Sequence, residues 1–223
     1  MRVLALDSAT DACSAAILRN DAVLARRFET MRRGHSEVLM PLVRDVMQSA
    51  GFGFDEIDLI ATTIGPGGFT GLRIGLSSAR ALALASGIPL IGVTTLEAVA
   101  RAQSAGRTPL LVALDTKRAD IYLQLFDQDL TPLGAPTASL PAEIEERLPP
   151  GPIAVAGNAA DAVLNALSGR SPPLESSDGP ALPDAAVVAA IGAARYAANP
   201  SPELPRPLYL RPPDARLPDG TLA

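Results

Sequence analysis

An apolar strand that ends in aspartate occurs twice in this chain, and each copy is followed by a turn and a returning strand. The first copy spans 2–7 and the second spans 110–115. Short apolar runs bounded by turn residues are typical of buried strands. The repeat therefore favours a fold of two related α/β lobes, although a chance similarity between two hairpins would give the same pattern.

The other segments of the first half alternate between strand and helix patterns. Strands are expected at 13–18, 22–30, 59–63 and 90–93, and helices at 36–50, 70–86 and 94–104. Pro41 predicts that the first helix is kinked there or begins later. Thr94, with Glu97 three residues on, predicts a capping box. A mixed sheet with helices on its face is thus expected for a first lobe at 1–104.

The second half predicts a second lobe and a proline-rich end. A second lobe is expected at 105–198, with further strands at 121–126 and 153–156 and helices at 159–167 and 184–198. Eleven of the 21 prolines fall within 172–218. We therefore expect an extended tail at 199–223.

The composition excludes several classes of protein. The net charge is −5, which argues against a protein whose main function is to bind the phosphate backbone of a nucleic acid. Cys13 is the only cysteine and His35 the only histidine, which excludes a disulfide framework and the two-histidine zinc protease motif. No run approaches the roughly 20 apolar residues of a membrane helix, so a cytoplasmic protein is expected.

A glycine-rich block at 65–75 follows one predicted strand and opens the next helix. Glycines in this position can direct backbone N–H groups at an anion. The phosphate-loop pattern fails because Lys117, the only lysine, lies far beyond the block, and Thr70 interrupts the dinucleotide pattern. We favour a tight turn that feeds a helix over an anion site.

The helix after this block carries small residues at every fourth position, Gly71, Gly75, Ala79 and Ala83. Such a ridge allows another helix to approach closely, with Ile74, Ser78 and Leu82 beside it. The alternative is that the ridge packs on the protein's own sheet.

Two further groups of residues are candidates for binding. Asp7 and Thr10, at the end of the first strand, could hold a hydrated metal ion beside a nucleotide phosphate, or could simply satisfy the amides of their turn. Gly157 follows the corresponding strand of the second half. The basic residues Arg26, Arg27, Arg32 and Arg33 form either a solvated face or a contact for RNA or an acidic partner.

Several of these segments together resemble one known family. The chain resembles the TsaB (YeaZ) family in the opening 4–14, the stretch 33–37, the glycine-rich block 65–75, the segment 92–96, the segment 115–122 and the late Tyr209-Leu210-Arg211. Gly68 stands where that family more often carries serine. The resemblance spans most of the chain and is strongest over 1–100.

The resemblance implies an actin/Hsp70-like (ASKHA) fold, α/β with two lobes. It implies a non-catalytic subunit, working with the catalytic paralogue TsaD and the ATPase TsaE to place threonylcarbamoyl on the adenosine beside the anticodon of tRNA. TsaD carries two histidines as metal ligands, whereas this chain has His35 alone.

Partners and ligands are implied in the same way. TsaD would pair with the two helices of the first lobe, which would form a homodimer when TsaD is absent, and tRNA would be reached through the complex. No cofactor is expected to bind tightly, although ATP or ADP at the partner interface fits the family. The interface residues expected are Leu39, Leu42, Val43, Val46, Gly71, Ile74, Gly75, Ser78, Ala79, Leu82 and Ala83.

Two other functions remain as alternatives. A nucleotide-dependent, sugar-kinase-like phosphotransferase would use Asp7, Thr10 and Gly157. A glycoprotease-like hydrolase is disfavoured because the chain lacks a second histidine for the metal.

Overall fold

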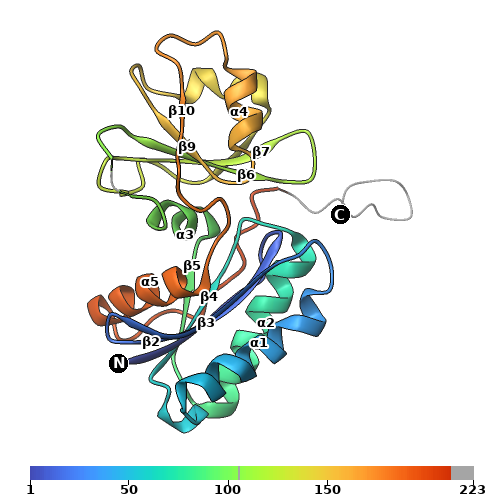
Figure 1. Cartoon of the computed structure of the whole chain (residues 1–223), viewed down its shortest axis with the longest axis vertical. Coiled ribbons are helices and arrows are strands. Elements are labelled where there is room, and N and C mark those ends of the chain that lie inside the picture. Colours follow the sequence, from blue (N-terminus) through green and yellow to red (C-terminus); the bar gives the residue numbers. More distant parts are fainter. Residues whose placement is uncertain (105, 212–223) are drawn as a thin grey trace.

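The computed structural model describes residues 1–104 and 106–211, which form two lobes, each built on a five-stranded mixed sheet (Figure 1). The sheet of the first lobe has the order β3-β2-β1-β4-β5. Its strands are β1 Arg2–Asp7, β2 Ala12–Arg19, β3 Ala22–Thr30, β4 Leu59–Thr63 and β5 Leu90–Val93. β1, β2 and β3 form an antiparallel meander, whereas β4 and β5 run parallel to β1.

The sheet of the second lobe repeats this topology. Its order is β10-β9-β6-β7-β8. Its strands are β6 Leu110–Asp115, β7 Ile121–Phe126, β8 Thr137–Ser139, β9 Ala154–Ala156 and β10 Glu175–Ser176. β6 pairs antiparallel with β7 and parallel with β9, as β1 does with β2 and β4. The two strands that end in aspartate, β1 and β6, therefore occupy equivalent places in two sheets of the same topology.

Helices cover both faces of the first sheet. α1 His35–Ala50 and α2 Phe69–Ser86 pack side by side on one face, and α5 Ala185–Ala198 lies across the other (Figure 1). The core on the α1–α2 side includes Leu4 and Ile60, both fully buried. The core on the α5 side contains their neighbours in the same strands, among them Val3, Ala5, Leu59 and Ala61, because successive side chains of a strand point to opposite faces of the sheet.

The position of α5 corrects the predicted lobe boundary. We expected residues 184–198 in the second lobe, but α5 contacts β1, β2, β4 and β5 of the first. The α5 face of the first sheet, which carries Val3 and Leu59, would otherwise be exposed. Gly192 fits directly over Ala61, because a Cβ there would lie 2.7 Å from the Ala61 Cβ.

The ends of two helices also differ from prediction. α1 begins at His35 and contains Pro41, so the later start is wrong. α3 spans Thr95–Arg101 and ends before the predicted residue 104. Thr94 Oγ1 accepts a hydrogen bond from the Glu97 amide at 3.2 Å, but the Glu97 carboxylate pairs with Arg195 of α5.

The remaining elements are short. They are the helix α4 Ala160–Ala166 and three 3-10 turns at Phe54–Glu56, Pro141–Glu143 and Glu145–Arg147. Among the described residues, no helix combines the length and the hydropathy that crossing a membrane requires.

After α5 the C-terminal segment continues along the first lobe. Residues 199–211 form no helix or strand, as the proline content predicts, and the rest of the expected tail lies outside the described residues. The Leu208 amide donates to the Ile64 carbonyl at 2.7 Å, and Pro205 is buried beside Gly92. The segment thus holds Tyr209 against the start of α2.

Candidate functional site

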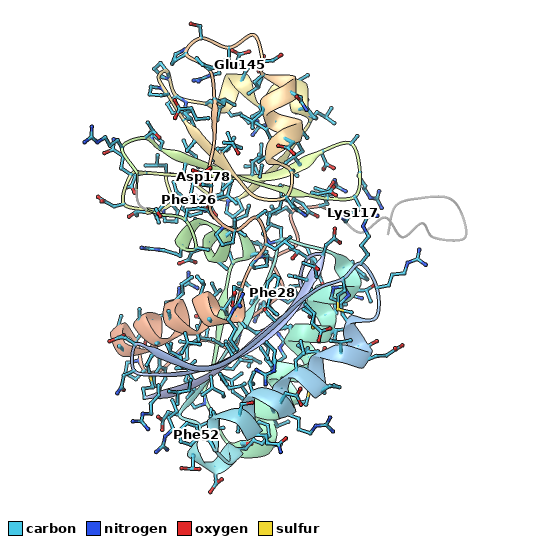
Figure 2. The ribbon with its side chains drawn as sticks, in the orientation of Figure 1. Phe28, Phe52, Lys117, Phe126, Glu145 and Asp178 are labelled. Atoms are coloured by element: carbon cyan, nitrogen blue, oxygen red, sulfur yellow. The ribbon has the colours of Figure 1, made fainter. Side chains whose placement is uncertain are left out.

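A cavity of about 430 Å³ lies between the lobes, where β1 and β6 both end. The turn after β1 supplies Thr10 and Asp11, and the turn after β6 supplies Thr116 and Lys117. Lys117 extends at the junction of the lobes (Figure 2). Ser8 and Ala9 of the β1 turn line it as well. The other lining residues come from the segments that lead into α1 and α2, from the first turns of these helices, and from Leu114, Asp115 and Asn158.

Asp7, at the end of β1, lies beneath this cavity and does not line it. Its side chain is 0% exposed, and its Oδ1 accepts from Thr63 Oγ1 at 2.7 Å and from the Ala9 amide at 3.2 Å. Its Oδ2 is buried with no hydrogen-bond partner among the described residues. Burial raises the pKa of Asp7 to about 7, although the hydrogen bond from Thr63 opposes the change.

The glycine-rich block closes over the turn that follows Asp7. A Cβ at Gly67 would lie 2.2 Å from the Ala9 carbonyl oxygen, and one at Gly71 would lie 2.1 Å from that of Ser8. The Gly68 amide donates to Ala9 at 2.8 Å, and Ser8 Oγ donates to Gly71 at 2.8 Å. The structure thus shows the close-packed turn that the sequence favoured, with glycine required by the approach of two backbones.

The turn after β6 is open by comparison. Asp115 Oδ1 accepts from the Lys117 amide at 2.7 Å, and the Lys117 ammonium contacts both Asp115 and Asp11 of the first lobe. Partial burial opposes ionisation of Asp115, but the amide and ammonium of Lys117 hold its pKa below the ordinary value. Asn158 Oδ1 accepts from the Asp115 amide at 2.9 Å. Lys117 therefore bridges the two lobes across the cavity.

The three predicted nucleotide residues are not brought together. Thr10 lines the cavity, Asp7 lies below it, and Gly157 packs on β6 of the other lobe. Gly157 has φ +102°, and a Cβ there would lie 2.0 Å from the Ala113 carbonyl oxygen. His35 Nε2 lies 2.9 Å from the Thr10 carbonyl oxygen. Gly157 thus shapes the start of α4, and His35 steadies the β1 turn.

The four predicted basic residues divide into two pairs. The Arg26 guanidinium pairs with Asp184, which raises the pKa of Arg26, and Arg27 donates to Ser49 Oγ at 3.0 Å. Arg32 and Arg33 are exposed and line the cavity. Only the second pair is therefore placed at the site.

The predicted interface residues lie mainly inside the chain. Seven of the eleven are buried, because the small-residue ridge of α2 packs on the first sheet and the β1 turn, and the apolar face of α1 packs beside it. The four that remain partly exposed are Gly71, Ile74, Ser78 and Leu82. The interpretation of the ridge as a contact for another molecule is corrected: it is an internal contact.

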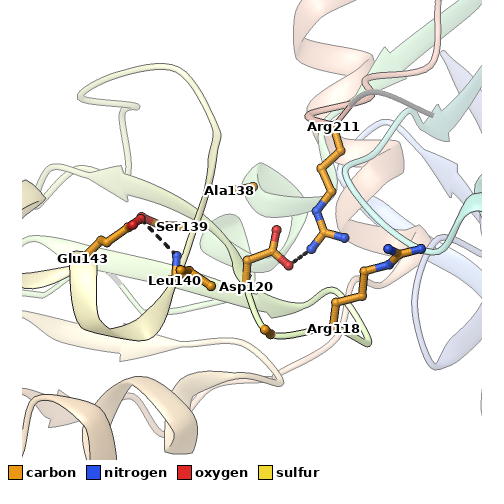
Figure 3. Close-up of a pocket in the computed structure, with 8 residues that line it drawn as sticks. Arg118, Asp120, Ala138, Ser139, Leu140, Glu143 and Arg211 are labelled. Carbon is orange, nitrogen blue, oxygen red and sulfur yellow. Dashed lines mark hydrogen bonds and ion pairs between the residues drawn. The ribbon is translucent and has the colours of Figure 1, made fainter. Parts of the chain in front are cut away.

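A second, shallow cavity of about 550 Å³ lies beside the β6–β7 turn (Figure 3). Asp120 and Arg211 form an ion pair across it, which joins the C-terminal segment to the second lobe. Arg118 extends nearby from the same turn (Figure 3). Sequence reasoning missed these residues, and it also missed the bridging role of Lys117, although Lys117 lies in the turn that repeats the one after Asp7.

Comparison with known proteins agrees with this architecture. The model of the family described as "TsaD: tRNA N6-adenosine threonylcarbamoyltransferase" matches residues 23–169. The "tRNA threonylcarbamoyladenosine biosynthesis protein TsaB" of Escherichia coli is 39% identical over 131 residues. That match covers 58% of this chain and 56% of the E. coli protein, so the chain spans little more than half the length of this relative.

Solved structures extend the likeness to nearly the whole chain. YeaZ from Pseudomonas aeruginosa has a TM-score of 0.81 and 27% identity, covering 94% of this chain and 99% of that one. The activator of the 2-hydroxyisocaproyl-CoA dehydratase from Clostridium difficile, at 10% identity and a TM-score of 0.55, shares the fold alone. The predicted actin/Hsp70-like α/β fold is confirmed. The TsaD family model matches this chain, and among its named relatives are TsaB and YeaZ proteins. The chain belongs to the TsaB (YeaZ) family.

Proposed function

We propose that this chain is a non-catalytic subunit that pairs with a TsaD-type catalytic subunit, together with TsaE, for threonylcarbamoylation of the adenosine beside the anticodon of tRNA. Membership of the TsaB family supports the pathway, because the E. coli relative is named for threonylcarbamoyladenosine biosynthesis. The chain would act in the cytoplasm, where tRNA is modified.

One observation carries the non-catalytic part of this proposal. The turn after β1 is filled by the backbone of the glycine-rich block, and the Asp7 carboxylate is enclosed beneath it. Gly67 and Gly71 already approach Ala9 and Ser8 closely, and Ser8 and Ala9 are each only 1% exposed, so this turn offers a phosphate little free surface. The sugar-kinase-like alternative needs Asp7 at the cleft, and we do not propose it.

The outer surface of α1 and α2 is the proposed contact for the catalytic subunit. It keeps Ile74, Ser78 and Leu82, the partly exposed residues of the predicted interface outside the ridge, and adds Met40 and Leu84, which are 41% and 87% exposed. Several apolar side chains that remain exposed on two adjacent helices favour burial against a partner, which one isolated leucine would not. The same surface would form the homodimer when the catalytic subunit is absent, and ATP or ADP would bind at the interface with it.

Reconstituted tRNA threonylcarbamoylation tests the proposal. The catalytic subunit and TsaE from the same organism would receive donor and ATP, with the chain added or omitted. We expect modification only when the chain is present, and equal modification in its absence would contradict the proposal.

The proposed surface has its own test. Leu84→Glu places a charge on it, whereas Leu133→Glu makes the same change at a leucine 56% exposed on the second lobe. We expect Leu84→Glu to weaken co-purification with the catalytic subunit by about tenfold or more, and Leu133→Glu to leave it unchanged. Equal effects of the two variants would place the contact elsewhere.

A further inference from the structure

The two strongly exposed aromatic side chains of the described residues lie together, at the start of α2. Phe69 and Tyr209 are 54% and 45% exposed, and their ring centroids are 5.9 Å apart. The Arg73 guanidinium carbon lies 3.5 Å from the Phe69 centroid and 5.8 Å from that of Tyr209, and Arg73 Nε donates to the Tyr209 hydroxyl at 2.9 Å. Three flat groups are thus held in a fixed cluster at the surface.

Positive charge adjoins this cluster. Phe69 also lines the cavity between the lobes, and Arg32 and Arg33 line the same cavity as exposed side chains. The acidic groups that face the cavity, Asp11 and Asp115, are engaged by Lys117. The surface therefore presents arginines in a chain whose net charge is −5. Local charge of this sign attracts a polyanion despite the acidic whole.

We propose that Arg32, Arg33, Phe69, Arg73 and Tyr209, here called the arginine–aromatic surface, bind RNA directly, with phosphates on the arginines and an unpaired base on an exposed ring. This inference rests on the proposed function, which supplies a tRNA with an unpaired anticodon loop. Single-stranded RNA is recognised by stacking on aromatic rings and arginine planes.

An acidic protein segment is the competing partner, and the geometry favours RNA over it. Carboxylates would use the arginines but have no use for two exposed rings. A base uses both, since it presents a π face to the ring while its phosphate meets a guanidinium. The anchoring of Tyr209 through Arg73 and Leu208 holds the ring in place before any ligand arrives.

Binding of a fluorescein-labelled anticodon stem–loop RNA to the full chain, followed by anisotropy over a range of salt concentrations, tests the charge. Arg32→Glu/Arg33→Glu is compared with Arg19→Glu/Arg107→Glu, which makes the same change in charge at exposed arginines elsewhere. We expect the first pair alone to weaken binding by about tenfold or more. The slope of log K against log salt should fall by about 0.7 for each phosphate that the variant no longer binds.

Two variants of one residue test the stacking. Tyr209→Phe keeps the ring and loses the hydroxyl, whereas Tyr209→Leu loses the ring. We expect Tyr209→Phe to bind RNA within about twofold of the wild type and Tyr209→Leu to bind about fivefold more weakly or worse. Equal RNA binding by the two variants would overturn the proposal that a base stacks on the ring of Tyr209.

Parallel assays separate this proposal from the proposed function. Co-purification with the catalytic subunit is measured for every variant. If Arg32→Glu/Arg33→Glu breaks that association and leaves RNA binding unchanged, the surface is a protein contact and the RNA proposal is overturned. The same follows if the wild-type chain binds no RNA alone and forms no ultraviolet cross-link to it within the complex. If the chain binds RNA as expected but is dispensable for modification, the proposed function fails and the RNA surface stands.

Discussion

The turn after β1 and the turn after β6 occupy equivalent places in two sheets of the same strand order, but their aspartates are in opposite surroundings. Asp7 is fully buried, with a pKa raised to about 7 by burial. Asp115 lines the cavity, and Lys117 holds its pKa below the ordinary value despite partial burial. One carboxyl is enclosed in the first lobe, and the other joins a bridge between the lobes.

The difference comes from the helices α2 and α4, which follow β4 and β9, the parallel neighbours of β1 and β6, and not from the strands. α2 has 18 residues and begins with glycines that contact the β1 turn, whereas α4 has seven and leaves the β6 turn open to the cavity. Strand topology therefore fixes where each aspartate lies, and the packing of the helix that follows the neighbouring parallel strand decides whether it meets solvent.

The largest effect is expected at Asp7. Because its pKa is higher in the folded protein than in the unfolded chain, the free energy of unfolding should fall as pH rises from about 4 to about 7. The loss should level off above pH 7 and amount to roughly 4 kcal/mol. Asp7→Asn should abolish this decline, since an amide oxygen can accept from Thr63 and Ala9 equally well.

Urea unfolding at pH 5 and pH 8 measures the change. Asp7→Asn should be more stable than the wild type at pH 8, with a smaller difference at pH 5. Asp129→Asn, at an exposed turn, is the control and should follow the wild type at both values. A wild-type stability that rises steadily over this range, with no gain in the variant, would show that Asp7 is ionised and accommodated.

The second effect is expected where α2 meets the β1 turn. Gly71→Ala would place a Cβ 2.1 Å from the Ser8 carbonyl oxygen, so backbone must move, at a cost of about 1–3 kcal/mol. Gly134→Ala, with no atom within 4 Å of the added Cβ, should change stability by less than about 0.5 kcal/mol. Denaturant midpoints measure both, and equal values would mean that the first turn is no tighter than an open loop.

A smaller effect is expected at the bridge between the lobes. Lys117 and Asp11 are 52% and 26% exposed at their side chains, and such pairs contribute about 0.5 kcal/mol. A double-mutant cycle with Lys117→Ala and Asp11→Ala should give a coupling of that size, reduced by salt. A coupling above about 2 kcal/mol would contradict a solvated bridge.

The smallest effect is expected from titration of Asp115. Because its pKa is lowered in the folded protein, its contribution to stability should be present above the unfolded pKa and lost as pH falls through the folded one. The coupling between Lys117→Ala and Asp115→Ala, a few tenths of a kcal/mol near pH 7, should therefore vanish at acid pH. A coupling that is unchanged down to pH 2 would remove Asp115 from the bridge.

The strands could be predicted from the sequence because their apolar runs are short and bounded by turns. The sheet to which α5 belongs could not, because a helix rich in alanine and valine on all sides does not reveal which sheet it covers. The group that the small-residue ridge of α2 contacts could not be predicted either. Gly71 and Gly75 indicate a close approach, but only the fold shows that the approaching group is Ser8 of the same chain.

The candidate site was predicted in part. Thr10, Arg32 and Arg33 reach the cavity, whereas Asp7 and Gly157 serve their own lobes. Burial separates these cases: Asp7 is enclosed beneath the start of α2 and Gly157 packs on β6, and neither contact can be deduced from the sequence. The cluster of Phe69, Arg73 and Tyr209 joins residues 136 apart in sequence through the hydrogen bond from Arg73 to Tyr209, so no local pattern could reveal it.

The rate of tRNA threonylcarbamoylation by the reconstituted complex containing Asp7→Asn tests most directly the claim that the first turn is structural and the chain non-catalytic. We expect a rate within about twofold of the wild-type complex at neutral pH, with the variant folded and bound to the catalytic subunit. A loss of a hundredfold or more in such a folded, assembled variant would show that the Asp7 carboxylate takes part in the chemistry, and would contradict a purely structural role for the first turn.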